Sequence, residues 1–133
     1  DVEILTGDFS QTLNKANGNT LFYFDPPYRP LSSTSSFNDY TKEAFNDLSQ
    51  IRLKSFCDKV HEKGFHFMLS NSDCAGNDKF FDDLFSEYHI ERVLASRNVN
   101  AVASKRGKLT EILVHNYPNK EEYDISKSYK IAL

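Results

Sequence analysis

Apolar and polar residues alternate in blocks along the chain, and each block predicts one structural element. Residues 20–24 form an unbroken run of β-forming residues, which is typical of a strand covered on both faces. Residues 42–63 carry apolar side chains at near-helical spacing, with Thr41 as the expected N-cap and Gly64 as the terminator. The positions expected to face the core from this helix are Phe45, Leu48, Ile51, Phe56 and Val60.

The remaining blocks are shorter, and they predict the rest of the fold. Further strands are expected at residues 2–5, 65–69, 90–95 and 109–117, and further helices at residues 9–16 and 78–87, the second burying Phe81, Leu84 and Phe85. Strands that alternate with helices favour an open, parallel α/β sheet, in which ligands bind at the carboxyl ends of the strands. Residues 1–117 are expected to form this domain and residues 118–133 a tail.

The composition is that of one ordinary globular domain. The chain has 133 residues, of which 39% are apolar and 26% charged. Its 16 Lys and Arg against 19 Asp and Glu give a net charge of −3, which excludes a chain that is basic throughout but allows a local basic stripe. No apolar run approaches the roughly 18 residues of a membrane span, and no signal-peptide pattern opens the chain. We therefore expect a soluble, cytoplasmic domain without membrane association.

The cysteines and histidines predict no metal site. Cys57 and Cys74 form no CxxC motif, and free thiols in a reducing compartment are the expected state. His61 and His66 are five residues apart with no carboxylate at ligand spacing. The sequence therefore predicts chemistry without a metal ion.

The main chemical signal is Asp25-Pro26-Pro27-Tyr28, at the end of an expected strand. Two adjacent prolines cannot donate ladder hydrogen bonds, so the strand ends here and the carboxylate of Asp25 stands on a stiff backbone. A carboxylate beside carbonyl acceptors matches an NH2 group, which has two hydrogens to donate. Tyr28 offers a flat face on which a planar base can stack. The plain alternative is a strand closed by a turn, in which Asp25 caps a backbone N–H.

The stretch from Asp25 to Ser32, followed by Phe37-Asn38-Asp39-Tyr40, resembles the catalytic region of Dam-type DNA adenine N6-methyltransferases of the D12 class. Further matching pieces occur in the family's order, and the resemblance covers roughly residues 2–117. These pieces are Gly7-Asp8-Phe9, Leu69 to Asp73, Arg97 with Asn100, and Arg106-Gly107 through Glu111 to Leu113. The resemblance implies a Rossmann-like α/β sheet that transfers a methyl group from S-adenosylmethionine to N6 of an adenine flipped out of double-stranded DNA.

The resemblance also implies roles for individual residues. Asp25 would accept a hydrogen bond from the target N6 and lie close to the methionine part of the cofactor. The Pro26 carbonyl would accept the second N6 hydrogen, and Tyr28 would stack on the flipped adenine. Asp8 and Phe9 match the family's position that contacts the adenine ring of the cofactor. No covalent intermediate is needed, because the methyl group of the sulfonium is already activated.

A serine-rich segment, residues 32–36, follows the candidate catalytic turn. It is expected to be a loop that orders over the substrate, with Phe37 and Tyr40 as its anchors, or else a plain linker. The polar residues Ser70 to Asp73 end another expected strand. They either support the pocket or form an ordinary turn.

A basic segment is the second signal for a nucleic-acid partner. Between residues 92 and 108 there are five basic residues and no acidic one, which are Arg92, Arg97, Lys105, Arg106 and Lys108. Asn100, Lys105 and Arg106 are expected to contact the DNA backbone. The alternative is a solvated loop with ordinary lysines.

Two departures from the family pattern stand out. None of the five glycines belongs to a GxG, so the family's glycine-rich cofactor loop is absent from this chain, and so is its target-recognition domain. We therefore expect a fragment of a longer protein, corresponding to the catalytic half, that binds the cofactor poorly on its own. An RNA or protein amine methyltransferase and a non-catalytic DNA-binding remnant stay open as alternatives. The recognition sequence (GATC is one candidate), the oligomeric state and an accompanying restriction enzyme also stay open.

Overall fold

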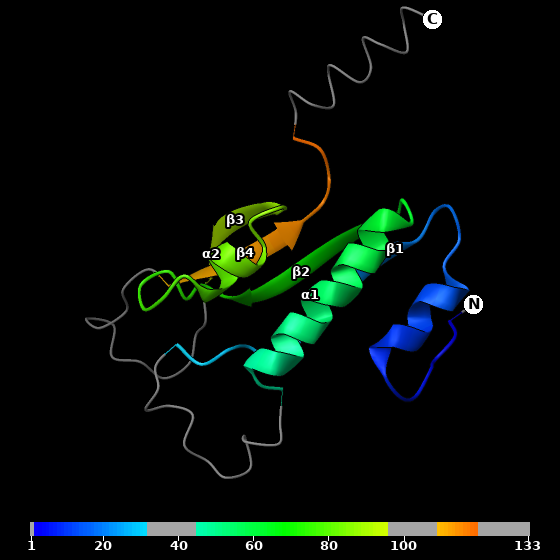
Figure 1. The fold of residues 1–133 in the computed structure, drawn as a ribbon, viewed down its shortest axis with the longest axis horizontal. Helices are drawn as coiled ribbons and strands as arrows, with labels where there is room; N and C mark the ends of the chain where they lie inside the picture. Colours follow the sequence, from blue (N-terminus) through cyan, green and yellow to red (C-terminus); the bar gives the residue numbers. More distant parts are fainter. Residues whose placement is uncertain (1, 32–44, 96–108, 120–133) are drawn as a thin grey trace, which may run out of the picture.

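The computed structural model describes residues 2–31, 45–95 and 109–119 (Figure 1). Its elements are a 3-10 helix, four strands and two α-helices, in a mixed α/β arrangement. In chain order they are η1 (Phe9–Lys15), β1 (Leu21–Phe24), α1 (Asp47–Glu62), β2 (His66–Ser72), α2 (Phe80–Leu84), β3 (His89–Leu94) and β4 (Thr110–His115). Four of the five expected strands are therefore present, each within three residues of its predicted bounds.

The described strands form one open sheet in the order β1-β2-β4-β3. Strands β1 and β2 pair in parallel, whereas β4 is antiparallel to both of its neighbours. Strands β1, β2 and β3 thus run in one direction, and the prediction of a wholly parallel sheet is wrong at β4. Parallel neighbours need a crossover connection, usually a helix, and no helix was expected between β3 and β4.

The expected first strand, residues 2–5, is not a strand in the structure. Val2 and Ile4 are 90% and 85% exposed, so the apolar side chains that suggested the strand cover no core here. A strand needs a partner for its backbone hydrogen bonds, and none of the described strands pairs with these residues.

The core of the described residues lies between one face of the sheet and α1, which crosses in front of the sheet in Figure 1. Phe22 of β1 and Phe67 of β2 are register partners, and both are buried on this face. On the opposite face Leu21 and Tyr23 are 48% and 61% exposed. The expectation that β1 is covered on both faces is therefore wrong for the described residues.

Helix α1 begins later than its apolar pattern predicts. Asn46 is the N-cap in place of Thr41, and its side chain accepts a hydrogen bond from the backbone N–H of Ser49. The helix ends as predicted, because Gly64 takes a positive φ of 82° that side-chain-bearing residues rarely adopt.

The buried stripe of α1 also differs from the prediction. Leu48 and Ile51 are 74% and 42% exposed, while Gln50 is only 1% exposed. The prediction was wrong because it assigned core positions by hydrophobicity, whereas a polar residue occupies one of them. Phe56 and Val60 are buried as predicted. In the shorter helix α2 and its C-cap, Phe81 and Phe85 are buried, and Leu84 is half-buried.

The two cysteines are free thiols, as predicted, and both are buried. Burial raises the pKa of Cys57 to about 12, so this thiol stays protonated and unreactive in the folded protein. Within the described ranges, no helix combines the length and apolarity that crossing a membrane requires. No group of three or more His, Cys, Asp or Glu side chains in the same ranges could hold a metal ion.

Candidate active site

The carboxylate of Asp25 lies at the carboxyl end of β1, directly after Phe24. Its Oδ1 accepts a hydrogen bond from the hydroxyl of Ser70 in β2, at 3.2 Å. Because side chains alternate along a strand, Asp25 points away from the face that Phe22 and Phe24 share with α1. The carboxylate thus stands exposed on the sheet face that no described helix covers. Tyr23, on the same face, donates a hydrogen bond to the oxygen of Ser70 at 3.4 Å.

Tyr28 is half-buried, and its hydroxyl donates a hydrogen bond to Oε2 of Glu111 at 3.1 Å. Partial burial, followed by the contact with this carboxylate, raises the pKa of Tyr28 above its ordinary value. Glu111 reaches the site because β4 pairs with β2, with Glu111 opposite Ser72. No role was predicted for Glu111, although a single acidic residue beside the apolar run of residues 112–114 could have indicated one.

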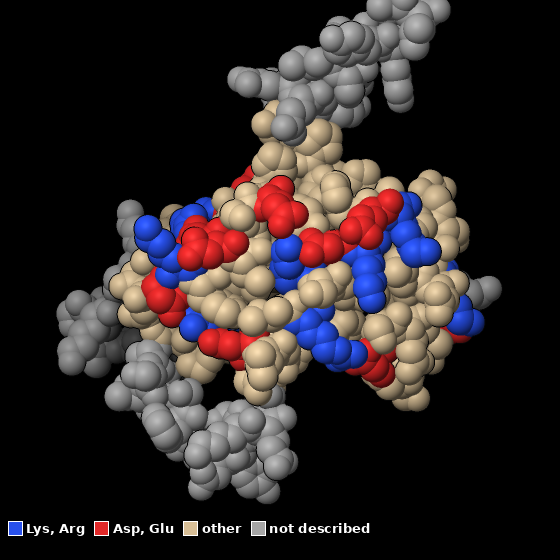
Figure 2. All heavy atoms as spheres, in the orientation of Figure 1, with Lys and Arg blue, Asp and Glu red and all other residues tan. Residues whose placement is uncertain are grey.

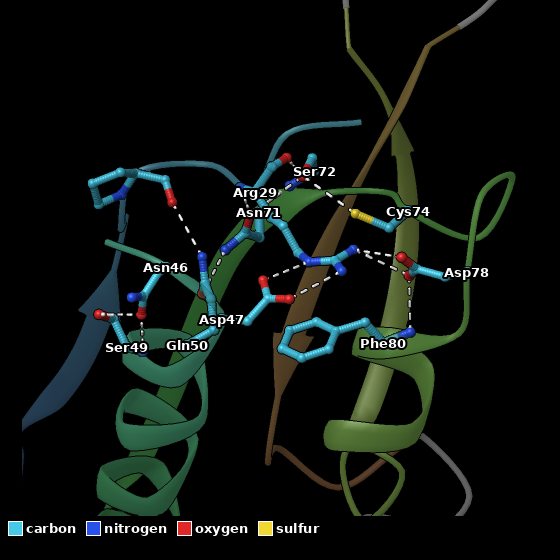
Figure 3. A network of polar contacts seen from close by, with 11 residues as sticks. Arg29, Asn46, Asp47, Ser49, Gln50, Asn71, Ser72, Cys74, Asp78 and Phe80 are labelled. Carbon is cyan, nitrogen blue, oxygen red and sulfur yellow. Dashed lines mark hydrogen bonds and ion pairs between the residues drawn. The ribbon is translucent and has the colours of Figure 1, made fainter. Parts of the chain in front are cut away.

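The backbone after Asp25 is bound by buried side chains of α1 and β2, as the dashed lines of Figure 3 show. Gln50 Nε2 donates to the carbonyl of Pro27 at 3.2 Å, and Asn71 Oδ1 accepts from the backbone N–H of Arg29 at 2.9 Å. The hydroxyl of Ser72 donates to the carbonyl of Arg29 at 2.5 Å. The candidate catalytic turn is therefore attached to two elements of the core.

The side chain of Arg29 connects three parts of the chain (Figure 3). Its Nε and Nη2 bind the two oxygens of Asp47 at 2.8 and 3.2 Å, and its Nη1 binds Asp78 at 2.8 Å. The guanidinium also lies 4.3 Å above the ring of Phe80. The hydrogen bonds that Arg29 donates to Asp47 raise the pKa of Arg29, and the hydrogen bond that Arg29 donates to Asp78 lowers the pKa of Asp78. This contact joins the first turn of α1 to the loop before α2.

Arg29→Ala is expected to lower the free energy of unfolding by about 2 kcal/mol at neutral pH, because Arg29 is mostly buried and both acids lose their partner. The pKa of Asp78 in the folded protein lies below its value of about 4 in the unfolded chain. The ion pair with Arg29 therefore stabilises the folded protein fully at pH values above about 4. This stabilisation is lost as the pH falls through the folded-state pKa. Urea unfolding of wild type and variant, between neutral pH and about pH 3, measures the difference, which should shrink in acid.

A matched control for that experiment is Arg52→Ala. Arg52 also forms a two-bond ion pair, with Asp8 at 2.8 and 2.6 Å, but its side chain is 58% exposed. An exposed ion pair contributes little to stability, so this variant should lose much less stability than Arg29→Ala. Equal losses in the two variants would contradict the structural role of Arg29.

The two residues predicted to bind cofactor adenine, Asp8 and Phe9, lie on the α1 side of the sheet. The carboxylate of Asp8 caps η1 by accepting from the backbone N–H of Ser10 at 3.1 Å, besides binding Arg52. The ring of Phe9 packs edge-on against Phe56, with centroids 5.2 Å apart, beneath the Arg52 guanidinium. No hydrogen bond joins these residues to Asp25 in the described structure, and their cofactor role stays a prediction.

Five of the predicted substrate-binding residues lie outside the described residues. They are Phe37, Tyr40, Asn100, Lys105 and Arg106. Arg92, at the start of the basic segment, is described and binds Asp73 and Asp82 at 3.1 and 2.6 Å. Figure 2 shows basic and acidic side chains interspersed on the α1 face, so this face presents no stripe of one sign.

Comparison with known proteins decides which family carries this arrangement. The family model for D12 class N6 adenine-specific DNA methyltransferases matches residues 1–99, which include Asp25 and Tyr28. The chain belongs to this family. The resemblance drawn from the Asp-Pro-Pro-Tyr turn is thereby confirmed, and the alternatives outside the family lose their support.

Relatives in this methyltransferase family include the type II methyltransferase M1.LlaDCHI of Lactococcus lactis subsp. cremoris, 40% identical over 118 residues (89% of this chain). The type II methyltransferase M.MjaIII of Methanocaldococcus jannaschii is 43% identical over 118 residues (88% of this chain). The DNA adenine methylase of Vibrio cholerae is 27% identical over 110 residues, or 82% of this chain. The chain spans 40% of the length of each of the first two.

Proposed function

We propose that the protein carrying this chain transfers a methyl group from S-adenosylmethionine to N6 of an adenine flipped out of double-stranded DNA. The observation that carries the proposal is the placement of Asp25 and Tyr28. Both follow β1 at the carboxyl end of the sheet, and Ser70 and Glu111 from the neighbouring strands hydrogen-bond them. Membership of the family indicates the class of reaction, which is methyl transfer to adenine N6. The exposed carboxylate of Asp25 can accept a hydrogen bond from an amine.

The acceptors at this strand end suit an exocyclic amine. Adenine N6 has two hydrogens, one for the carboxylate of Asp25 and one for the carbonyl of Pro26. Two such bonds turn the nitrogen lone pair out of conjugation with the ring, so that it can attack a methyl group. After the attack N6 has one proton in excess, and the carboxylate of Asp25 is placed to accept it. Most of the rate enhancement then comes from positioning, which needs no covalent intermediate.

Tyr28 is the stacking surface for the flipped base in this proposal. Taking a base out of the duplex costs its stacking energy, and an aromatic ring in the pocket offsets part of that cost. The hydrogen bond to Glu111 fixes the end of the ring farthest from the backbone. A ring held at both ends loses little conformational entropy when the base arrives.

S-adenosylmethionine, when bound, supplies a methyl group already activated by its sulfonium sulfur. The described residues fit one end of that molecule, because the Asp25 carboxylate is exposed. At the other end the Asp8 carboxylate is bound by Arg52, so an adenosine group at Asp8 would share or displace that ion pair. We propose that the rest of the donor site, and the reading of the DNA sequence, lie in parts of the longer relatives that this chain does not match.

A Rossmann-like sheet is the fold that best accommodates this function. Strands β1, β2 and β3 run in one direction, α1 covers one face, and the candidate site lies at the carboxyl ends of β1 and β2. Open α/β sheets bind their ligands at such ends. The reversal of β4 brings Glu111 to that edge.

Methyl transfer to DNA by the complete protein tests the proposed function. Duplexes with and without GATC, and in parallel an RNA and a protein sample, are incubated with an isotopically labelled methyl donor, and the labelled products are identified by mass spectrometry. We expect label in N6-methyladenine of duplex DNA. Label in RNA or protein alone would support an amine methyltransferase of another class. DNA binding without transfer would support the non-catalytic alternative.

A further inference from the structure

Two amide side chains are buried in the core behind the candidate catalytic turn. Asn71 of β2 is 0% exposed and Gln50 of α1 is 1% exposed, although both neighbour the apolar residues between α1 and the sheet. Residues of this type are mostly exposed, and burying an amide costs free energy unless all its hydrogen-bonding groups find partners. The hydrogen-bond partners of Gln50 and Asn71 therefore indicate the role of the pair.

The pair closes a ring of hydrogen bonds around the backbone of one residue, Tyr28, and Figure 3 shows Gln50, Asn71 and Arg29, which take part in it. Gln50 Nε2 donates to the carbonyl of Pro27 at 3.2 Å, and Asn71 Nδ2 donates to Gln50 Oε1 at 3.1 Å. Asn71 Oδ1 then accepts from the backbone N–H of Arg29 at 2.9 Å. The ring thus binds the peptide groups on both sides of Tyr28. It binds the preceding one at the carbonyl oxygen of Pro27 and the following one at the backbone N–H of Arg29.

The direction of the ring requires a donor and an acceptor on each of the two side chains, and an uncharged amide supplies both. The carbonyl of Pro27 can only accept, and the backbone N–H of Arg29 can only donate. Gln50 must therefore turn its nitrogen to Pro27 and its oxygen to Asn71, and Asn71 must turn its nitrogen to Gln50. An ionised carboxylate at either position leaves two acceptors facing each other.

We infer that Gln50 and Asn71 are positioning residues, which act on the target base through Tyr28. The inference rests on the proposed function, because it assigns the pair to the residue that stacks on adenine. The ring fixes the backbone on both sides of Tyr28, and Glu111 fixes the hydroxyl, so the aromatic plane is held from two directions. A shift of about 1 Å at a substrate-contacting residue is enough to lower a rate substantially.

Asn71→Asp in the complete protein tests the inference. At about pH 8 the carboxylate still accepts from Arg29 but opposes Gln50 Oε1, so the ring opens. Gln50→Met is the second variant, because it removes the bond to Pro27 without adding charge. We expect kcat for adenine methylation to fall about tenfold in each variant, with KM for DNA changed less than about twofold.

Asn116→Asp is the matched control at the opposite end of the sheet. Asn116 also uses both ends of its amide, accepting from the N–H of Phe67 at 2.8 Å and donating to the carbonyl of Phe65 at 2.9 Å. We expect it to lower the melting temperature comparably, with kcat of the folded enzyme within about twofold of wild type. A kcat loss in this control equal to that in Asn71→Asp would overturn the inference, since a general effect of losing an amide that binds the backbone would then explain both.

A double-mutant cycle separates positioning from other effects. In a Tyr28→Ala background the pair has no side chain to position, so adding Asn71→Asp should cost less than about twofold. Losses that multiply would overturn the inference, as would wild-type kcat in Asn71→Asp. These outcomes leave the proposed function standing. That function fails instead if the wild-type protein methylates no adenine.

Discussion

Asp25→Ala in the complete protein is expected to lower adenine methylation at least about 100-fold, the scale of removing one positioned transition-state contact. The variant loses an acceptor for N6 and the group placed to take the surplus proton. Its free energy of unfolding should fall by no more than about 1 kcal/mol, because the Asp25 side chain is exposed and loses one hydrogen bond, from the buried Ser70. Single-turnover methylation with a tritiated donor, beside thermal unfolding, measures both effects.

Asp25→Asn is the graded control for this experiment. It preserves the size of the side chain and one acceptor oxygen but removes the charge, so we expect a loss of about tenfold, between wild type and alanine. If the alanine variant retained a tenth or more of wild-type activity, Asp25 would not have the role proposed for it. A fall in stability large enough to unfold the variant would also contradict its placement outside the core.

Tyr28→Ala is expected to reduce methylation by about 10- to 100-fold, since stacking on an aromatic ring contributes about 1–3 kcal/mol per base. Tyr28→Phe preserves the ring and removes only the hydrogen bond to Glu111, so its loss should stay within about threefold. The fluorescence of 2-aminopurine at the target position reports base flipping in the same samples. It should weaken in the alanine variant and persist in the phenylalanine variant.

Equal losses in the two Tyr28 variants would mean that the hydroxyl, and not the ring, makes the functional contact. The carboxylate of Glu111 would then be the group to examine next, by Glu111→Gln. Unchanged flipping in Tyr28→Ala would assign the stacking surface to another residue.

Several features of the site and fold were readable from the sequence because local chemistry decides them. A run of large β-forming residues before two prolines predicts a strand that ends beside Asp25, and β1 ends at Phe24, one residue before it. Gly64 ends α1 because the required positive φ suits glycine. The combination of motifs around Asp25 and Tyr28 identified the family that the comparison then showed.

Other features depend on contacts between distant parts of the chain, and local pattern could not predict them. The buried stripe of α1 was misassigned because Gln50 is buried for its hydrogen bonds to Asn71 and Pro27, not for its hydrophobicity. Asn46 replaces Thr41 as the cap, and either residue type caps a helix well. The reversal of β4, which brings Glu111 to Tyr28, follows from strand pairing rather than from periodicity.

The position of β4 also sets the order in which a newly made chain can complete its fold. In the described sheet, β3 is joined to β2 only through β4, although β4 leaves the ribosome after both. Until residue 115 has emerged, β3 has no described neighbour to pair with, and the core lacks Ile112 and Val114. Glu111 arrives in the same step, so the carboxylate that holds Tyr28 enters the site only when the sheet closes. A nascent chain that stops short of β4 therefore lacks its finished core and its finished site together.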